Sequence, residues 1–167
     1  ARLTRTAVLE VLGADFVRRY LDLQGPALVV SSACSSTAKV FGNAARLIAA
    51  GLDSIPGGGA EILVDRVRRL LHCHTKATAD EWIDVMRAAH RAGLRTTATM
   101  MYGTVETDEE RLEHLLRLRA LQDETRGFTA FIPLAFHVDN NALKGIGKPT
   151  AQTDLKVHAV ARLLLDN

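Results

Sequence analysis

Cys34 lies where a predicted strand gives way to a predicted helix, a position that favours thiol chemistry. A helix N-terminus stabilises a thiolate through its partial positive charge and its backbone N–H groups. Cys34 is therefore the candidate catalytic nucleophile for acyl transfer. The alternative is a small buried side chain, which is the usual environment of a free cysteine. The flanking serines favour a tight turn and are Ser31, Ser32, Ser35 and Ser36.

Three further candidates follow predicted strands. The glycines Gly57, Gly58 and Gly59 can leave backbone N–H groups for an anion, and the alternative is a plain turn. Glu106 is placed to accept hydrogen bonds from ribose hydroxyls, and the alternative is a carboxylate that complements a helix dipole. His137 ends a strand and is a candidate substrate contact, the alternative being a rim histidine bonded to nearby backbone.

Two other polar groups are interpreted without a ligand. The triplet His72-Cys73-His74 invites a metal site, but neighbours on a helix diverge by about 100°. Three consecutive residues rarely bind one ion, so no metal site is predicted. Glu61 is interpreted as an ordinary carboxylate in the first turn of a helix.

The elements that position these residues alternate along the chain. Strands are expected over 27–30, 52–55, 96–102 and 128–136, and helices over 6–23, 35–50, 62–71 and 151–166. The helix over 62–71 has a basic outer side. Two capping boxes, Thr78 with Glu81 and Thr107 with Glu110, begin two more helices, which end near 93 and 127.

This alternation predicts an α/β fold with parallel strands and right-handed helical crossovers. It forms either a partial (β/α) barrel or an open layered sheet. Ligands of such sheets bind at the carboxyl ends of the strands, where the candidate residues lie. Open sheet edges favour self-association.

Composition narrows the partners of the chain. Its 167 residues carry a net charge of +2, with 24% charged and 5% aromatic residues, so no basic surface with stacking rings is expected and nucleic acid is an improbable partner. No apolar run has the length of a membrane span, so no membrane partner is expected. Two cysteines suit a reducing, cytoplasmic location. A small-molecule ligand is the expected partner.

Residues 51–167 carry several distinctive motifs. They are Gly51-Leu-Asp-Ser-Ile-Pro-Gly-Gly-Gly-Ala-Glu-Ile62, Ala98-Thr-Met-Met-Tyr-Gly103 and Phe131-Ile-Pro-Leu-Ala-Phe-His137. They resemble strand units four to six of the barrel in two radical S-adenosylmethionine (radical SAM) enzymes of the futalosine route to menaquinone. These enzymes are aminodeoxyfutalosine synthase and cyclic dehypoxanthinyl futalosine synthase. Arg126 stands where the resemblance leads us to expect glycine.

The resemblance implies S-adenosylmethionine as cofactor, cleaved to a 5′-deoxyadenosyl radical. That radical adds to an enolpyruvyl-benzoate in the synthase and abstracts hydrogen in the cyclase. Gly57–Gly59 and Glu106 would bind the cofactor, and His137 a nucleoside or aromatic acid. The family also holds a 4Fe–4S cluster on Cys-x-x-x-Cys-x-x-Cys, whose ligands this chain lacks, since its cysteines are Cys34 and Cys73. We therefore expect a fragment that is inactive alone.

Residues 1–52 resemble a different family, the thiolase-like β-ketoacyl synthases, with Cys34 at the position of the acyl-accepting cysteine. This indicates a chimera joined at Ala50-Gly51-Leu52, with a condensing-enzyme-like segment 1–51 and a partial radical SAM barrel 52–167. The leading interpretation is the radical SAM fragment. The alternatives are a β-ketoacyl synthase fragment that acts through Cys34 and a non-catalytic α/β binding domain.

Overall fold

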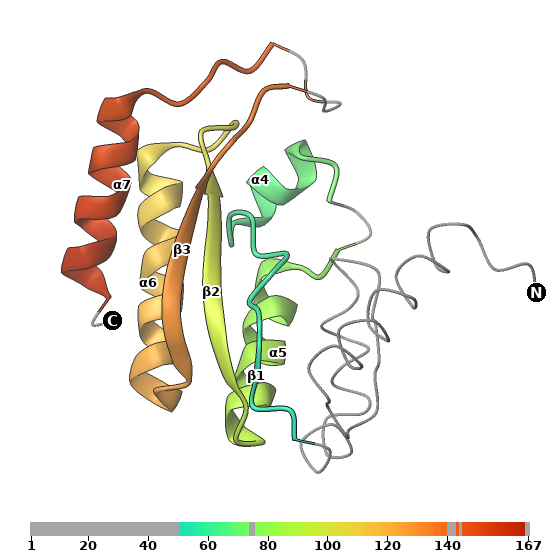
Figure 1. Ribbon diagram of the computed structural model, residues 1–167. Helices are drawn as coiled ribbons and strands as arrows, with labels where there is room; N and C mark the ends of the chain where they lie inside the picture. Colours follow the sequence, from blue (N-terminus) through green and yellow to red (C-terminus); the bar gives the residue numbers. More distant parts are fainter. Residues whose placement is uncertain (1–50, 74–75, 140–142, 144, 166–167) are drawn as a thin grey trace, which may run out of the picture.

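The computed structural model describes residues 51–73, 76–139, 143 and 145–165. Helices and strands alternate along this part of the chain, as the sequence predicted (Figure 1). In order they are β1 (Ser54–Ile55), α4 (Asp65–Leu70), α5 (Ala79–Arg91), β2 (Arg95–Tyr102), α6 (Asp108–Thr125), β3 (Phe128–Ala135) and α7 (Ala151–Leu164). The strand predicted over 27–30 and the helices predicted over 6–23 and 35–50 lie outside the described residues.

The three strands form one open parallel sheet in the order β1-β2-β3. Ser54 lies opposite Arg95 at one end, and Tyr102 lies opposite Ala135 at the other. Helices α4 and α5 connect β1 to β2, and α6 connects β2 to β3. This is the parallel α/β arrangement that the alternation predicted.

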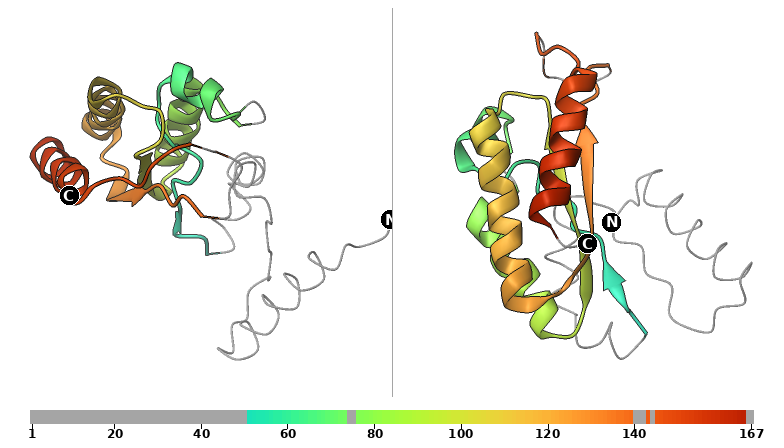
Figure 2. Two further views of the ribbon diagram at one scale, coloured as in Figure 1. Left: turned by 90° about the horizontal axis from the view of Figure 1, so that it is seen from above. Right: turned by 90° about the vertical axis from the view of Figure 1, so that its left-hand side faces the viewer.

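Helices α5, α6 and α7 lie on one face of the sheet, which Figure 2 shows as an arc of helices outside the strands. The cause is the alternation within β2, where every second side chain is buried, beginning with Thr96 and ending with Tyr102. Ala98 packs in a core with Trp82 of α5 and Leu115 of α6. The sheet is therefore half buried, with its core between strands and helices.

The opposite face of the sheet carries no described helix (Figure 2). Ile132 and Leu134 of β3 share this face with Thr99 and Met101 of β2, because neighbouring residues in the register point the same way. The exposed fractions of Ile132 and Leu134 are 42% and 49%. Self-association through the open edges of the sheet stays a prediction.

Both predicted capping boxes are formed. The Thr78 hydroxyl accepts from the Glu81 amide while the Glu81 carboxylate accepts from the Thr78 amide, and Thr107 and Glu110 repeat the pattern. Each box satisfies two amides that a helix start would otherwise leave unpaired. Helix α6 ends at Arg126, whose φ of 51° lies in the left-handed region. That conformation explains why glycine would be expected there.

Helix α4 is shorter than the sequence predicted and begins at Asp65 instead of residue 62. Ile62 and Leu63 are fully buried in the irregular segment that precedes it. The Leu63 amide donates to His114 Nδ1 of α6 at 2.9 Å, a contact that a helical turn would not provide. The predicted basic outer side is also wrong in part, because the Arg68 side chain turns inward and is only 4% exposed.

Candidate functional site

The predicted site residues follow three neighbouring parallel strands. Gly57–Gly59 follow β1, Glu106 follows β2, and His137 follows β3. Because the strands are parallel, Glu106 and His137 lie at the carboxyl edge of the sheet, the upper end in Figure 1, whereas β1 ends beside Thr96 and the loop that follows it begins beside the middle of β2. This edge is where ligands of parallel α/β sheets bind.

Gly57 is fastened directly to β2. Its amide donates to Thr97 Oγ1 at 3.1 Å, and its carbonyl accepts from Thr99 Oγ1 at 2.8 Å. A Cβ atom on Gly57 would lie 1.8 Å from the Thr97 carbonyl oxygen. Only glycine therefore permits this close approach.

The remaining carbonyls of the loop are held by side chains from two helices. Trp82 of α5 donates to the Gly58 carbonyl at 3.1 Å. Arg68 of α4 donates to the Ala60 carbonyl at 2.6 Å and to the Gly59 carbonyl at 3.3 Å. The buried arginine thus replaces the backbone partners that a loop lacks.

Two amides of the loop are left over. Within the described residues, the N–H groups of Gly58 and Gly59 donate to no partner, and both glycines are partly exposed. Gly59 has a φ of 80°, a left-handed value at which glycine is least strained. Successive free amides on a rigid turn suit an anionic group. The binding of a cofactor here stays a prediction.

The sequence interpretation of Glu61 as an ordinary carboxylate in the first turn of a helix is wrong. Glu61 lies before α4, outside any helical turn, with a φ of 42°, which is strained for a residue with a side chain. Its Oε1 forms an ion pair with Lys76. Its Oε2 is buried and has no hydrogen-bond partner among the described residues. Nothing in the local pattern indicated this strain.

The Glu106 side chain is fully buried in the turn between β2 and α6. Oε1 accepts from the Gly103 amide and from Arg111 Nε at 2.8 Å, while Oε2 accepts from the Thr104 amide and hydroxyl. Burial raises the pKa of the Glu106 carboxyl, but hydrogen bonds from Thr104, Gly103 and Arg111 outweigh it, and the pKa lies below its usual value. A ribose hydroxyl would have to displace one of these donors to reach the carboxylate.

His137 stands at the edge in a different environment. Its side chain is 75% exposed, and its Nδ1 accepts weakly from the Asp139 amide at 3.4 Å. The ring is accessible to a ligand above the end of β3. Its role as a substrate contact stays a prediction.

The candidates that contain cysteine lie partly outside the described residues. Cys34 lies outside the described residues, as does His74. Cys73 Sγ donates to the Leu71 carbonyl at 3.8 Å. In the described part of the chain, no three histidine, cysteine or acidic residues gather as a metal site would require. None of the described helices has the length and apolar character to cross a membrane.

Sequence comparison gives a family. A family model described as "Radical SAM superfamily" matches residues 14–118. The matched range includes strand β2, the glycine loop and the join at residues 50–52. It also begins within the segment that resembles the β-ketoacyl synthases, for which the comparisons give no support.

Three curated proteins illustrate the similarity. The chain is 55% identical over 122 residues to "Aminodeoxyfutalosine synthase" of Thermus thermophilus, and the aligned region covers 71% of this chain and 32% of that protein. It is 45% identical over 122 residues to "Cyclic dehypoxanthine futalosine synthase" of Streptomyces coelicolor, covering 73% and 30%. It is 42% identical over 164 residues to "5-amino-6-(D-ribitylamino)uracil--L-tyrosine 4-hydroxyphenyl transferase 1" of Methanosarcina barkeri, covering 95% and 43%. The chain spans less than half the length of each.

Proposed function

We propose, from the premise that this chain belongs to the radical SAM superfamily, that it is a portion of an enzyme of the futalosine route to menaquinone. The identity of 55% over 122 residues to an aminodeoxyfutalosine synthase supports this substrate class. The observation that carries the proposal is the glycine loop after β1, in which the amides of Gly58 and Gly59 have no partner among the described residues.

The loop suits the cofactor that the family uses. S-adenosylmethionine carries a carboxylate on its methionyl end, and two rigid amides with a turn behind them suit such an anion. Thr97 and Thr99 hold the loop against β2, while Trp82 and Arg68 hold its carbonyls away from the ligand. Such fixed donors cost little reorganisation when the anion binds.

A 4Fe–4S cluster does not fit the residues of this chain. The family site takes at least three cysteine thiolates, and the chain has two cysteines, Cys34 and Cys73. We therefore propose that the chain alone binds S-adenosylmethionine without cleaving it. Anaerobic reconstitution with iron and sulfide should leave the protein colourless, and a cluster absorption band with stoichiometric iron would contradict this proposal.

Calorimetric titration with S-adenosylmethionine tests the loop. We expect a dissociation constant in the millimolar range, about 4 kcal/mol of binding energy, because the cluster that anchors the methionyl end is missing. Thr99→Val removes the hydroxyl that holds the Gly57 carbonyl and should weaken binding about fivefold. Thr129→Val is the matched control, since its hydroxyl serves the Thr96 carbonyl away from the loop. Equal affinities for both variants, or no binding to folded protein, would contradict the assignment.

Saturation-transfer NMR separates the two relatives' substrate classes. The futalosine assignment predicts contact with an enolpyruvyl-benzoate, with perturbation of the exposed His137 ring. Preferential contact with tyrosine would instead favour the hydroxyphenyl transferase relationship.

A further inference from the structure

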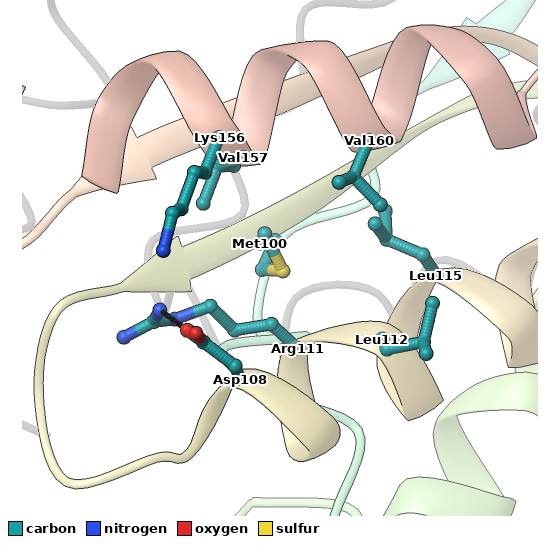
Figure 3. Close-up of a pocket in the computed structure, with 8 residues that line it drawn as sticks. All are labelled: Met100, Asp108, Arg111, Leu112, Leu115, Lys156, Val157 and Val160. Carbon is teal, nitrogen blue, oxygen red and sulfur yellow. Dashed lines mark hydrogen bonds and ion pairs between the residues drawn. The ribbon is translucent and has the colours of Figure 1, made fainter. Parts of the chain in front are cut away.

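A cavity of about 360 Å³ lies between α6, α7 and the helix-covered face of β2 (Figure 3). Its floor is Met100, which points to the opposite face of β2 from Thr97 and Thr99, the residues that hold the glycine loop. The cavity therefore lies on the other side of the sheet from the glycine loop, although Arg111 in its lining also binds Glu106. Its volume lies within the range of small-molecule sites in proteins.

The walls of the cavity are aliphatic. The side chains that line it together with Met100 come from both helices and are Leu112, Leu115, Val157 and Val160. Leu112 and Val160 are 42% and 37% exposed, although both sit at the cavity. No aromatic ring lines it, so an alkyl chain fits better than a stacked ring. A methionine floor adapts readily to such a chain.

One end of the cavity is cationic. Figure 3 shows the Lys156 ammonium of α7 and the Arg111 guanidinium of α6 extending toward the same end. Among the described residues, Lys156 has no ion pair and Arg111 Nη2 has no hydrogen-bond partner. Two like charges that approach each other in this way are stabilised by an anion between them.

The neighbouring carboxylates limit the charge of that anion. Glu106 is satisfied by two backbone amides and a hydroxyl as well as by Arg111 Nε. Asp108, the partner of Arg111 Nη1, is 68% exposed, so water screens its charge. One ammonium and one guanidinium N–H group thus suit a ligand with a single negative charge. A phosphate dianion would be repelled more strongly by the Asp108 carboxylate.

We propose that this cavity binds an aliphatic monocarboxylate. The alkyl chain lies against Met100, Leu115 and Val157, and the carboxylate lies between Lys156 and Arg111. The lining requires both the alkyl chain and the carboxylate of the ligand. The aliphatic walls offer no partner for a polar group, and the cationic end offers none for an apolar group.

Titration of the 167-residue chain with octanoate, followed by the methyl NMR signals of Leu112 and Val157, tests the proposal. We expect saturable shifts. Hexanoate should bind about fifteenfold more weakly, because each buried methylene contributes about 0.8 kcal/mol. Lys156→Gln should weaken octanoate about fivefold, and the matched control Lys148→Gln, at an exposed lysine outside the cavity, should not.

Val160→Phe provides an independent variant, because Val160 is partly exposed at the cavity and a larger side chain there can be tolerated by the fold. It should reduce octanoate affinity at least tenfold with an unchanged circular dichroism spectrum. The proposal is overturned if octanoate gives no saturable shifts, if hexanoate binds equally well, or if Lys156→Gln and Lys148→Gln behave alike. Unreduced affinity in folded Val160→Phe would overturn it as well.

Discussion

Protonation of His114 in the unfolded chain should make this protein less stable as the pH falls below about 6.5. The ring is fully buried, and its Nδ1 accepts the Leu63 amide proton at 2.9 Å. Burial lowers the pKa of His114 from 6.5 to about 3, and the charges of Arg68 and Arg117 act in the same direction. The backbone of Thr99 favours the charged ring and raises the pKa of His114, but burial outweighs this effect.

The sign and size follow from proton binding. Between pH 6.5 and 3, the unfolded chain binds a proton at this histidine and the folded chain does not. The free energy of unfolding therefore falls with falling pH, at up to roughly 1.36 kcal/mol per pH unit. Because the unfolded histidine is already half protonated at its own pKa, the loss from pH 6.5 to about pH 4.5 amounts to roughly 2 kcal/mol.

Urea unfolding followed by circular dichroism across that pH range measures the effect. His114→Asn keeps an acceptor near the Nδ1 position and cannot be protonated, so its unfolding free energy should lose this pH dependence even though the smaller side chain lowers stability at every pH. His158→Asn, at an exposed histidine, should keep the wild-type dependence. In folded wild type, the His114 ring signals should stay constant down to about pH 5. Identical pH dependence in wild type and His114→Asn would refute the reasoning, as would titration of the folded ring near pH 6.5.

Two further substitutions test the backbone of the site. Gly57→Ala should lower the free energy of unfolding in urea titrations by roughly 3 kcal/mol, because its Cβ would collide with the Thr97 carbonyl. In the control Gly147→Ala, the new Cβ meets nothing within 4 Å, so stability should change by less than about 0.5 kcal/mol. Equal effects of the two substitutions would contradict the close approach. Arg126→Gly should raise stability by about 1 kcal/mol because it relieves a left-handed φ of 51°, whereas Arg126→Ala should give no gain, and a gain from alanine would argue against strain at this position.

Local patterns predicted the elements that local physics determines. The two capping boxes and the alternating burial of β2 depend on residues a few positions apart, and both are formed. The start of α4 could not be predicted in this way. Ile62 and Leu63 fit a helical pattern, but the Leu63 amide pairs with His114, 51 positions further along the chain. That contact engages the Leu63 amide outside any helix, and the helix begins only at Asp65.

The candidate site shows the same difference between features that the sequence predicted and features that it did not. Each of Gly57–Gly59, Glu106 and His137 follows a parallel strand, as the sequence predicted, but β1 ends beside Thr96 and so leaves the glycines beside the middle of β2. What those side chains contact is a separate question. A carboxylate after a strand can face a ligand or accept hydrogen bonds from its own turn. Glu106 does the second, and its partners Gly103, Thr104 and Arg111 all lie within five positions of it. The inward turn of Arg68 has no local signal, because its neighbours Arg66 and Arg69 are arginines too.

The fastening of the glycine loop has a consequence for the opening motions of the protein. Amide protons in loops ordinarily exchange with solvent through small local fluctuations. The segment from Gly57 to Leu63 is bound to β2 through Thr97, to α5 through Trp82 and to α6 through the Leu63 bond to His114. The Leu63 amide can meet water only when the packing between these elements opens. Its exchange should therefore be as slow as that of the central strand, so that the segment with the least regular structure belongs to the last cooperative unit to open.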